Sequence, residues 1–301
     1  MRVFVTGASG HIGSAVLPEL LNAGHEVVGY ARSDAAAATV EATGAEVLHG
    51  SLDDLDTIRA ATEASDGVIH LAFRHDAMRS GDFEGAAETD SRAINTMIEA
   101  LAGTDKSLVI SSGTLMISFL GLDRIGVESD VLPGGPRIDA ENAVIASAER
   151  GVRSSVVRLT PTVHSSLDHH GFVPALVAIA RERGFAAYVG EGTNRWPAVH
   201  TLDAAHLYRL AVEAAPAGTR LHAVGDEGVP FREIAEAIGR NLNVPVKSIP
   251  GEEADDYFTY LSLFVQLDNP TSSAATQQLM DWKPVHAGLI ADLDEGHYFQ
   301  A

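Results

Sequence analysis

The stretch VTGASGHIGSAVLPELLNAGHEVVGYARSD, residues 5–34, decides the fold, because it predicts a strand, a glycine-rich turn, a helix and a second strand. Gly7, Gly10 and Gly13 have the spacing GxxGxxG where the first strand passes into the helix. The first glycine permits a tight turn, the second lets the backbone approach a pyrophosphate, and the third lets the helix pack closely on the strand. The stretch therefore predicts a dinucleotide site rather than a strand–turn–helix with incidental glycines.

Backbone N–H groups at the start of such a helix face the phosphates of a bound dinucleotide. The loop residues that we expect to contact the cofactor are Gly7, Ser9, Gly10, His11, Ile12 and Gly13.

The end of the second strand selects between NAD and NADP, because an NAD-binding loop usually offers a carboxylate there for the ribose hydroxyls. Ala31 occupies that position, followed by Arg32, which can pair with a 2′-phosphate, and Ser33, which can donate a hydrogen bond to it. These residues favour NADP(H). The alternatives are that Arg32 is only solvated, or that the nearby Asp34 serves a ribose.

The alternation of apolar strand patterns with helical patterns continues to about residue 160 and predicts an α/β fold, a Rossmann-type doubly wound parallel sheet. We expect residues 1–160 to form an NADP-binding domain. Residues 161–301 should form a smaller, mostly helical substrate-binding region, with about 197–226 returning to the first domain.

Composition and charge exclude several classes of protein. The 301 residues carry a formal net charge of −20, which disfavours binding to nucleic acid or to anionic membranes. No run of about 18 apolar residues predicts a membrane span, and the N-terminus does not read as a secretory signal. Without cysteine there is neither a disulfide framework nor a thiolate metal site, and a cytoplasmic protein is the expectation.

Further motifs resemble the extended branch of the short-chain dehydrogenase/reductase superfamily, and within it the atypical group of NAD-dependent epimerase/dehydratase-like proteins. TGASGHIG is similar to that branch's TGxxGxxG, and HGSLDD, VIHLAF, VISSGT and VVRLTPTVH follow in the family's order. The resemblance covers nearly the whole chain. It implies that Leu52 and Asp53 lie near the adenine, that Leu71 and Ala72 lie on the cofactor side, and that Val163 borders the nicotinamide.

The chain departs from the family at its proton donor, a Tyr placed four residues before a Lys. No tyrosine of this chain has a lysine four residues later. Matching the family's helix to residues 137–151 puts Arg137 about where the Lys belongs and Pro133 about where the Tyr belongs. Proline cannot donate a proton, and arginine holds its proton too firmly for acid–base work, so Arg137 is expected to anchor cofactor ribose or phosphate.

Other groups are candidates for the chemistry. Ser112 and Thr114 lie where the family polarises a carbonyl, or they satisfy the backbone at a strand end. Asp90 matches a site position of the atypical group, or it caps the helix expected from residue 90. His164 would lie near the nicotinamide and could act as an acid, or it is a loop histidine that binds backbone.

The loop TNRWPAVH, residues 193–200, could line a substrate pocket through Arg195, Trp196 and His200, or form a clasp that buries Trp196. Tyr260 could close over the substrate or be core packing, and Phe73 is a further candidate contact. The run DHH at 168–170 lacks the spacing of a metal site, and no metal is expected.

We therefore expect an NADPH-dependent oxidoreductase that reduces a ketone or aldehyde to an alcohol with a non-standard proton donor. The alternatives are a nucleotide-sugar epimerase or dehydratase, and a non-enzymatic redox sensor that binds NADP(H). The expected partner is a small-molecule substrate. A homodimer is compatible with the resemblance, because extended relatives often pair through two helices.

Overall fold

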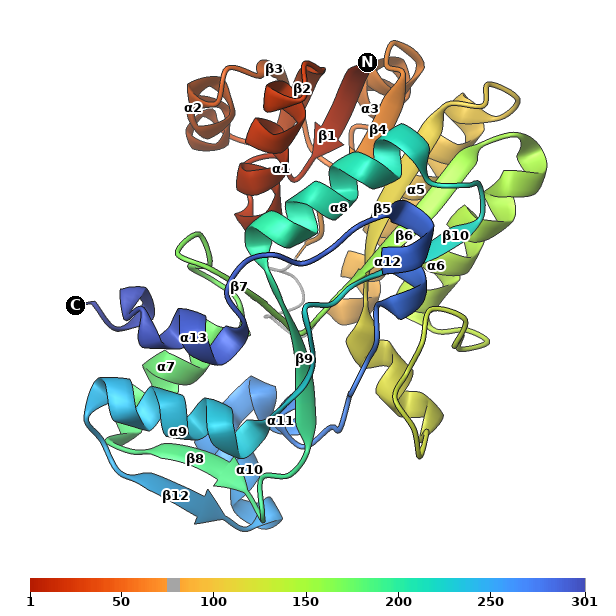
Figure 1. The fold of residues 1–301 in the computed structure, drawn as a ribbon. Coiled ribbons are helices and arrows are strands. Elements are labelled where there is room, and N and C mark those ends of the chain that lie inside the picture. The colour runs from red at the N-terminus through yellow and green to blue at the C-terminus, as the bar shows by residue number, and fades with distance from the viewer. Residues whose placement is uncertain (75–81, 301) are drawn as a thin grey trace.

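The computed structural model describes residues 1–74 and 82–300. Its centre is a parallel sheet of seven strands, as the sequence predicts (Figure 1). From one edge to the other, the strands are β10 (Thr219–Ala223), β6 (Arg153–Leu159), β5 (Ser107–Gly113), β4 (Gly67–His70), β1 (Arg2–Thr6), β2 (Glu26–Ala31) and β3 (Glu46–His49).

Helices cover both faces of this sheet, so its strands carry buried apolar side chains on both faces. Successive residues of a strand point to opposite faces, so Val3 and Val5 pack in one core while Phe4 packs in another. The first core contains residues of α1 (His11–Asn22) and α8 (Thr201–Ala214). The first core also contains Val40 of α2 (Asp34–Ala42). Around the second core and the carboxyl edge of the sheet lie α3 (Leu55–Glu63), α5 (Phe83–Leu101), α6 (Pro136–Ala146), η1 (Thr114–Leu120) and η2 (Ser147–Arg150).

The second lobe has a separate apolar core. It is built from α7 (Phe172–Arg183), β8 (Ala186–Val189), α9 (Phe231–Leu242), β12 (Val246–Ile249), η3 (Gly251–Glu253), α10 (Ala254–Phe258), η4 (Thr259–Leu261), α11 (Ser262–Val265), α13 (Leu289–Asp294) and η5 (His297–Phe299). This lobe is less uniformly helical than expected, because β8 and β12 pair in parallel within it.

A third sheet joins the two lobes. It consists of β7 (Thr162–His164), β9 (Arg195–His200) and β11 (Asp226–Pro230), with β9 in the centre (Figure 1). Of the segment expected to return, α8 packs on α1 and β10 adds to the sheet beside β6, whereas β9 and β11 stay in the joining sheet. Helix α12 (Ala274–Met280) then packs against α8 and β10.

Candidate active site

The glycine loop lies between β1 and α1, at the carboxyl edge of the sheet. Gly7 has φ +65°, and a Cβ there would lie 2.7 Å from the backbone nitrogen of Ala72. A Cβ at Gly13 would lie 2.3 Å from the Gly7 carbonyl oxygen, so both glycines are required by the fold. Gly10 differs, because its φ of −80° is ordinary and its nearest neighbour would be 3.2 Å away. Its missing side chain is better explained by the close approach of a ligand.

The region after β2 carries no carboxylate before Asp34, which is the first residue of α2. Arg32 is exposed, and Ser33 caps α2 by accepting a hydrogen bond from the Ala36 N–H at 3.3 Å. The Ser33 hydroxyl therefore already has a structural role, which the sequence analysis missed. Asp53 is likewise occupied at the surface, since its carboxylate accepts from Arg92 at 2.9 Å.

Arg137 lies in the first turn of α6 and reaches the ends of β4 and β5. Its guanidinium donates to the Ser111 carbonyl oxygen at 3.0 Å and to Asp90 Oδ2 at 3.4 Å, and it lies 4.2 Å from the centre of the Phe73 ring. The side chain keeps 21% of its surface exposed. These contacts hold a cation at the sheet edge that the glycine loop also borders.

Asp90 is not a helix cap, and that alternative was wrong. Helix α5 begins at Phe83, and Asp82 caps it by accepting from the Gly85 N–H at 2.9 Å. The helix formers between the two aspartates let the helix start earlier. Asp90 therefore lies in mid-helix, where it is 3% exposed and contacts both Arg137 and His70.

The two hydroxyl candidates are not brought together with Arg137. Ser112 lies on the same sheet face as Ile110, which packs in the core below α6, and its Oγ is buried. Thr114 is fully buried, and its hydroxyl donates to the Asn269 side chain at 3.1 Å. Gly113 between them has open space, because a Cβ there would meet only the Leu159 carbonyl oxygen, at 3.9 Å.

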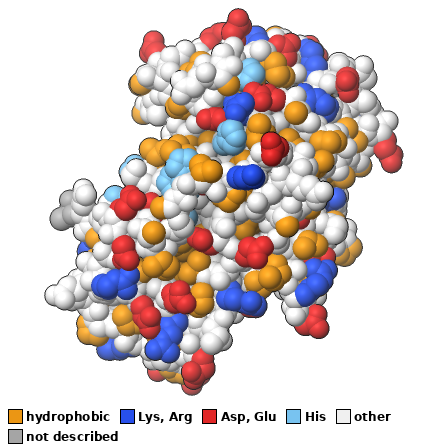
Figure 2. All heavy atoms as spheres, in the orientation of Figure 1, with side chains coloured by type: hydrophobic (Ala, Val, Ile, Leu, Met, Phe, Trp, Pro, Cys, Tyr) orange, Lys and Arg blue, Asp and Glu red, His pale blue; other side chains and the backbone are white. Residues whose placement is uncertain are grey.

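His164 is a strand residue of β7 rather than a loop residue. It is fully buried, and its Nδ1 lies 3.0 Å from Asp292 Oδ2 on α13. His200 caps α8, with Nδ1 accepting from the Leu202 N–H, and stacks on His286. Burial and the neighbouring His164 and His286 lower the pKa of His200. These pairings fit structural roles at the junction of the lobes, where Figure 2 shows histidine side chains on the surface.

His11 faces the same junction from the first residue of α1. Its Nε2 lies 2.7 Å from the Thr201 hydroxyl, and its Nδ1 lies 3.6 Å from Asp168 Oδ1. Burial, together with nearby imidazoles such as His169 and His164, lowers the pKa of His11 to about 4. Burial raises the pKa of Asp168 to about 6.

Three of the substrate candidates are accounted for by core packing, by an ion pair or by exposure to solvent. Trp196 is fully buried in the core of the second lobe, so the clasp interpretation describes it better than a pocket wall. Arg195 pairs with Asp268 at 2.8 Å on the surface. Tyr260 is 55% exposed, so core packing was wrong for it.

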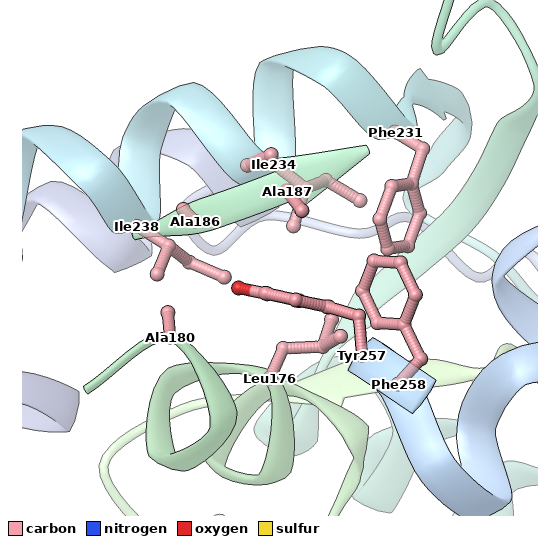
Figure 3. Close-up of a pocket in the computed structure, with 10 residues that line it drawn as sticks. Leu176, Ala180, Ala186, Ala187, Phe231, Ile234, Ile238, Tyr257 and Phe258 are labelled. Carbon is pink, nitrogen blue, oxygen red and sulfur yellow. The ribbon is translucent and has the colours of Figure 1, made fainter. Parts of the chain in front are cut away.

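A small cavity in the second lobe, lined mostly by apolar side chains, is too small for a substrate. It measures about 10 Å³ and lies between Leu176, Phe231, Tyr257 and Phe258 (Figure 3). Such a volume holds about one water molecule. The candidate site therefore rests on the groups at the sheet edge, where Arg137 and Gly113 lie, and not on this cavity.

The fold and this site define a Rossmann-type dinucleotide-binding protein, with a second lobe beside the sheet edge that carries the glycine loop. No helix of the described residues is long and apolar enough to cross a bilayer.

Comparisons with known proteins agree. Residues 3–119 match the NAD dependent epimerase/dehydratase family. The uncharacterized protein C2A9.02 of Schizosaccharomyces pombe is 46% identical over 99% of this chain and 100% of its own length. The 2'-dehydrokanamycin reductase of Streptomyces kanamyceticus is 28% identical over 84% of this chain and 71% of its own. A UDP-glucose 4-epimerase structure from Thermotoga maritima superposes with a TM-score of 0.77 at 18% identity, covering 99% of this chain and 98% of the other. The chain belongs to the NAD-dependent epimerase/dehydratase family.

Proposed function

We propose that this protein is an NADPH-dependent oxidoreductase that reduces a ketone or aldehyde to an alcohol. The observation that carries the proposal is the position of Arg137, a half-buried cation held by Asp90 and the Ser111 carbonyl at the sheet edge that the glycine loop borders. A cation there can hold the nicotinamide ribose without the family's lysine. The reductase similar to this chain supports the same class of reaction.

The bound cofactor would supply a hydride to the carbonyl carbon. The charge that develops on the carbonyl oxygen is stabilised by N–H donors fixed in advance, and the Arg137 guanidinium offers such donors. With proline at position 133 and glycine at 113, no side chain of these positions can donate the proton. We assign the proton to a water molecule admitted beside Gly113, where a Cβ would find open space. The hydroxide left behind is neutralised by solvent.

The same geometry speaks against nucleotide-sugar epimerisation as the first choice. That chemistry removes and returns a proton through a positioned base, and neither Pro133 nor Arg137 can serve as one.

The test is turnover of NADPH by the purified chain with a panel of small aldehydes and ketones. Arg137→Ala should lower kcat/KM by about 100-fold, the usual cost of one lost donor at a developing oxyanion. Arg232→Ala is the matched control, because Arg232 is an exposed arginine on α9 that pairs with Glu236. Tight NADPH binding without turnover of any carbonyl compound would refute the enzyme and favour the redox sensor.

The preference for NADPH has its own test. Arg32→Ala should weaken NADPH binding by about tenfold while NADH binding changes little, because only NADPH carries the 2′-phosphate. Equal weakening of both cofactors would overturn the assignment.

A further inference from the structure

A buried chain of side chains lies behind Arg137 and connects it to the glycine loop. Asp90 Oδ2 accepts from Arg137 at 3.4 Å, and Asp90 Oδ1 lies 3.0 Å from His70 Nε2. His70 Nδ1 lies 2.8 Å from the hydroxyl of Thr6, the residue that precedes Gly7. The Thr6 hydroxyl also accepts from the Ala72 N–H at 3.2 Å.

One arrangement of protons satisfies every donor and acceptor of this chain. An ionised Asp90 only accepts, so His70 Nε2 carries a hydrogen toward it. The Thr6 hydroxyl, which accepts from the Ala72 N–H, still has its own hydrogen to donate to His70 Nδ1. His70 is then a neutral imidazole with both nitrogens paired, and Asp90 has a donor on each oxygen.

Burial makes each link of this chain costly to break. Thr6, His70 and Asp90 are 0%, 2% and 3% exposed, so water cannot replace a lost partner. Removing one partner of a buried hydrogen bond leaves the other with its full desolvation cost. A carboxylate whose two oxygens both accept hydrogen bonds is held in one orientation. The orientation of Asp90 in turn fixes the position of the Arg137 guanidinium that pairs with it.

We infer that His70 is a positioning residue that orients Arg137 through Asp90 and ties this cation to the glycine loop through Thr6. The inference rests on the proposed function in taking Arg137 as a cofactor anchor. It adds that Arg137 binds well only while His70 holds the far oxygen of Asp90. His70 itself is buried and acts only through Asp90 and Thr6.

The decisive experiment is a double-mutant cycle with NADPH affinity, measured by fluorescence titration of the full chain, as the readout. His70→Leu should weaken NADPH by about tenfold in the natural protein, the size of one hydrogen bond to a charged group. In the Arg137→Ala background the same change should have almost no further effect, because the residue through which His70 acts is gone. An equal loss in both backgrounds would overturn the inference.

Two further variants guard against misfolding. His70→Gln places an amide N–H about where Nε2 lies and should restore most of the affinity that His70→Leu loses; failure to restore it in a folded protein would also overturn the inference. His206→Leu removes an imidazole of α8 that lies 2.8 Å from Glu19 of α1, and it should leave NADPH affinity unchanged. If Arg137→Ala alone leaves NADPH affinity and turnover intact, the proposed function fails instead.

Discussion

Asp168→Asn should stabilise the protein, and more strongly at alkaline pH. The Asp168 carboxylate is 3% exposed, accepts from the Gly171 N–H at 2.7 Å and lies 3.6 Å from His11. Burial raises its pKa from 3.8 to about 6, more than the Gly171 N–H and the other hydrogen bonds to it lower the pKa. The native carboxyl therefore binds its proton more tightly than the unfolded one.

The sign follows from linkage. A raised carboxyl pKa contributes stability below about pH 4, and that contribution is lost as the pH rises through about 6. The difference between the native and unfolded pKa values of Asp168 lowers the free energy of unfolding by at most about 3 kcal/mol above pH 6, and by about half of that at pH 5. Asparagine keeps an oxygen for Gly171 and carries no charge, so this cost should disappear. His11 is present in both proteins, so its own titration cancels to first order.

Urea unfolding at pH 5 and at pH 8 measures the effect. The free energy of unfolding of Asp168→Asn should exceed that of the natural protein at both values, by about 1 kcal/mol more at pH 8. Asp123→Asn, at an exposed aspartate, controls for the change in net charge. A gain that does not depend on pH, or a loss at pH 8, would refute the burial argument.

Two other predictions concern the glycine loop and a buried ion pair. Gly13→Ala should lower both stability and NADPH affinity, because its Cβ would overlap the Gly7 carbonyl. Gly10→Ala should leave the melting temperature unchanged and weaken NADPH binding by about tenfold. Calorimetry measures the melting temperatures, and fluorescence titration measures the affinities. A normal affinity in Gly10→Ala would contradict the ligand approach. Glu141→Gln should cost about 3–5 kcal/mol in urea unfolding, because it leaves the buried Arg158 without its carboxylate. A cost under about 1 kcal/mol would show that Arg158 finds other partners.

The sequence predicted the sheet because its local signals agree with one another. Apolar strands, glycine spacing and short helices all point to a parallel sheet covered on both faces. Asp90 was misread because Asp82 and Asp90 are equally good caps, and a local pattern cannot decide between them. RWPAVH was read as part of a loop, although β9 is the central strand of the joining sheet.

The pairings between distant segments could not be predicted at all. His164 and Asp292 are 128 positions apart, and Thr114 and Asn269 are 155 apart. Neither pair leaves a local signal in the chain. The sequence named the residues near the site, and only the fold showed which of their polar groups are already committed elsewhere.

The way the chain passes between the lobes bears on how this protein could be divided or reshaped. The chain enters the second lobe after β7, returns through α8 and β10, leaves again at β11, and returns once more as α12 before α13 (Figure 1). A fragment ending near residue 160 would lack α8 and β10, exposing the apolar face of α1 and the edge of β6. Neither lobe can be detached by a single cut. Exchanging the second lobe for that of a relative would require grafting several segments at once, which favours gradual change of its surface over wholesale replacement.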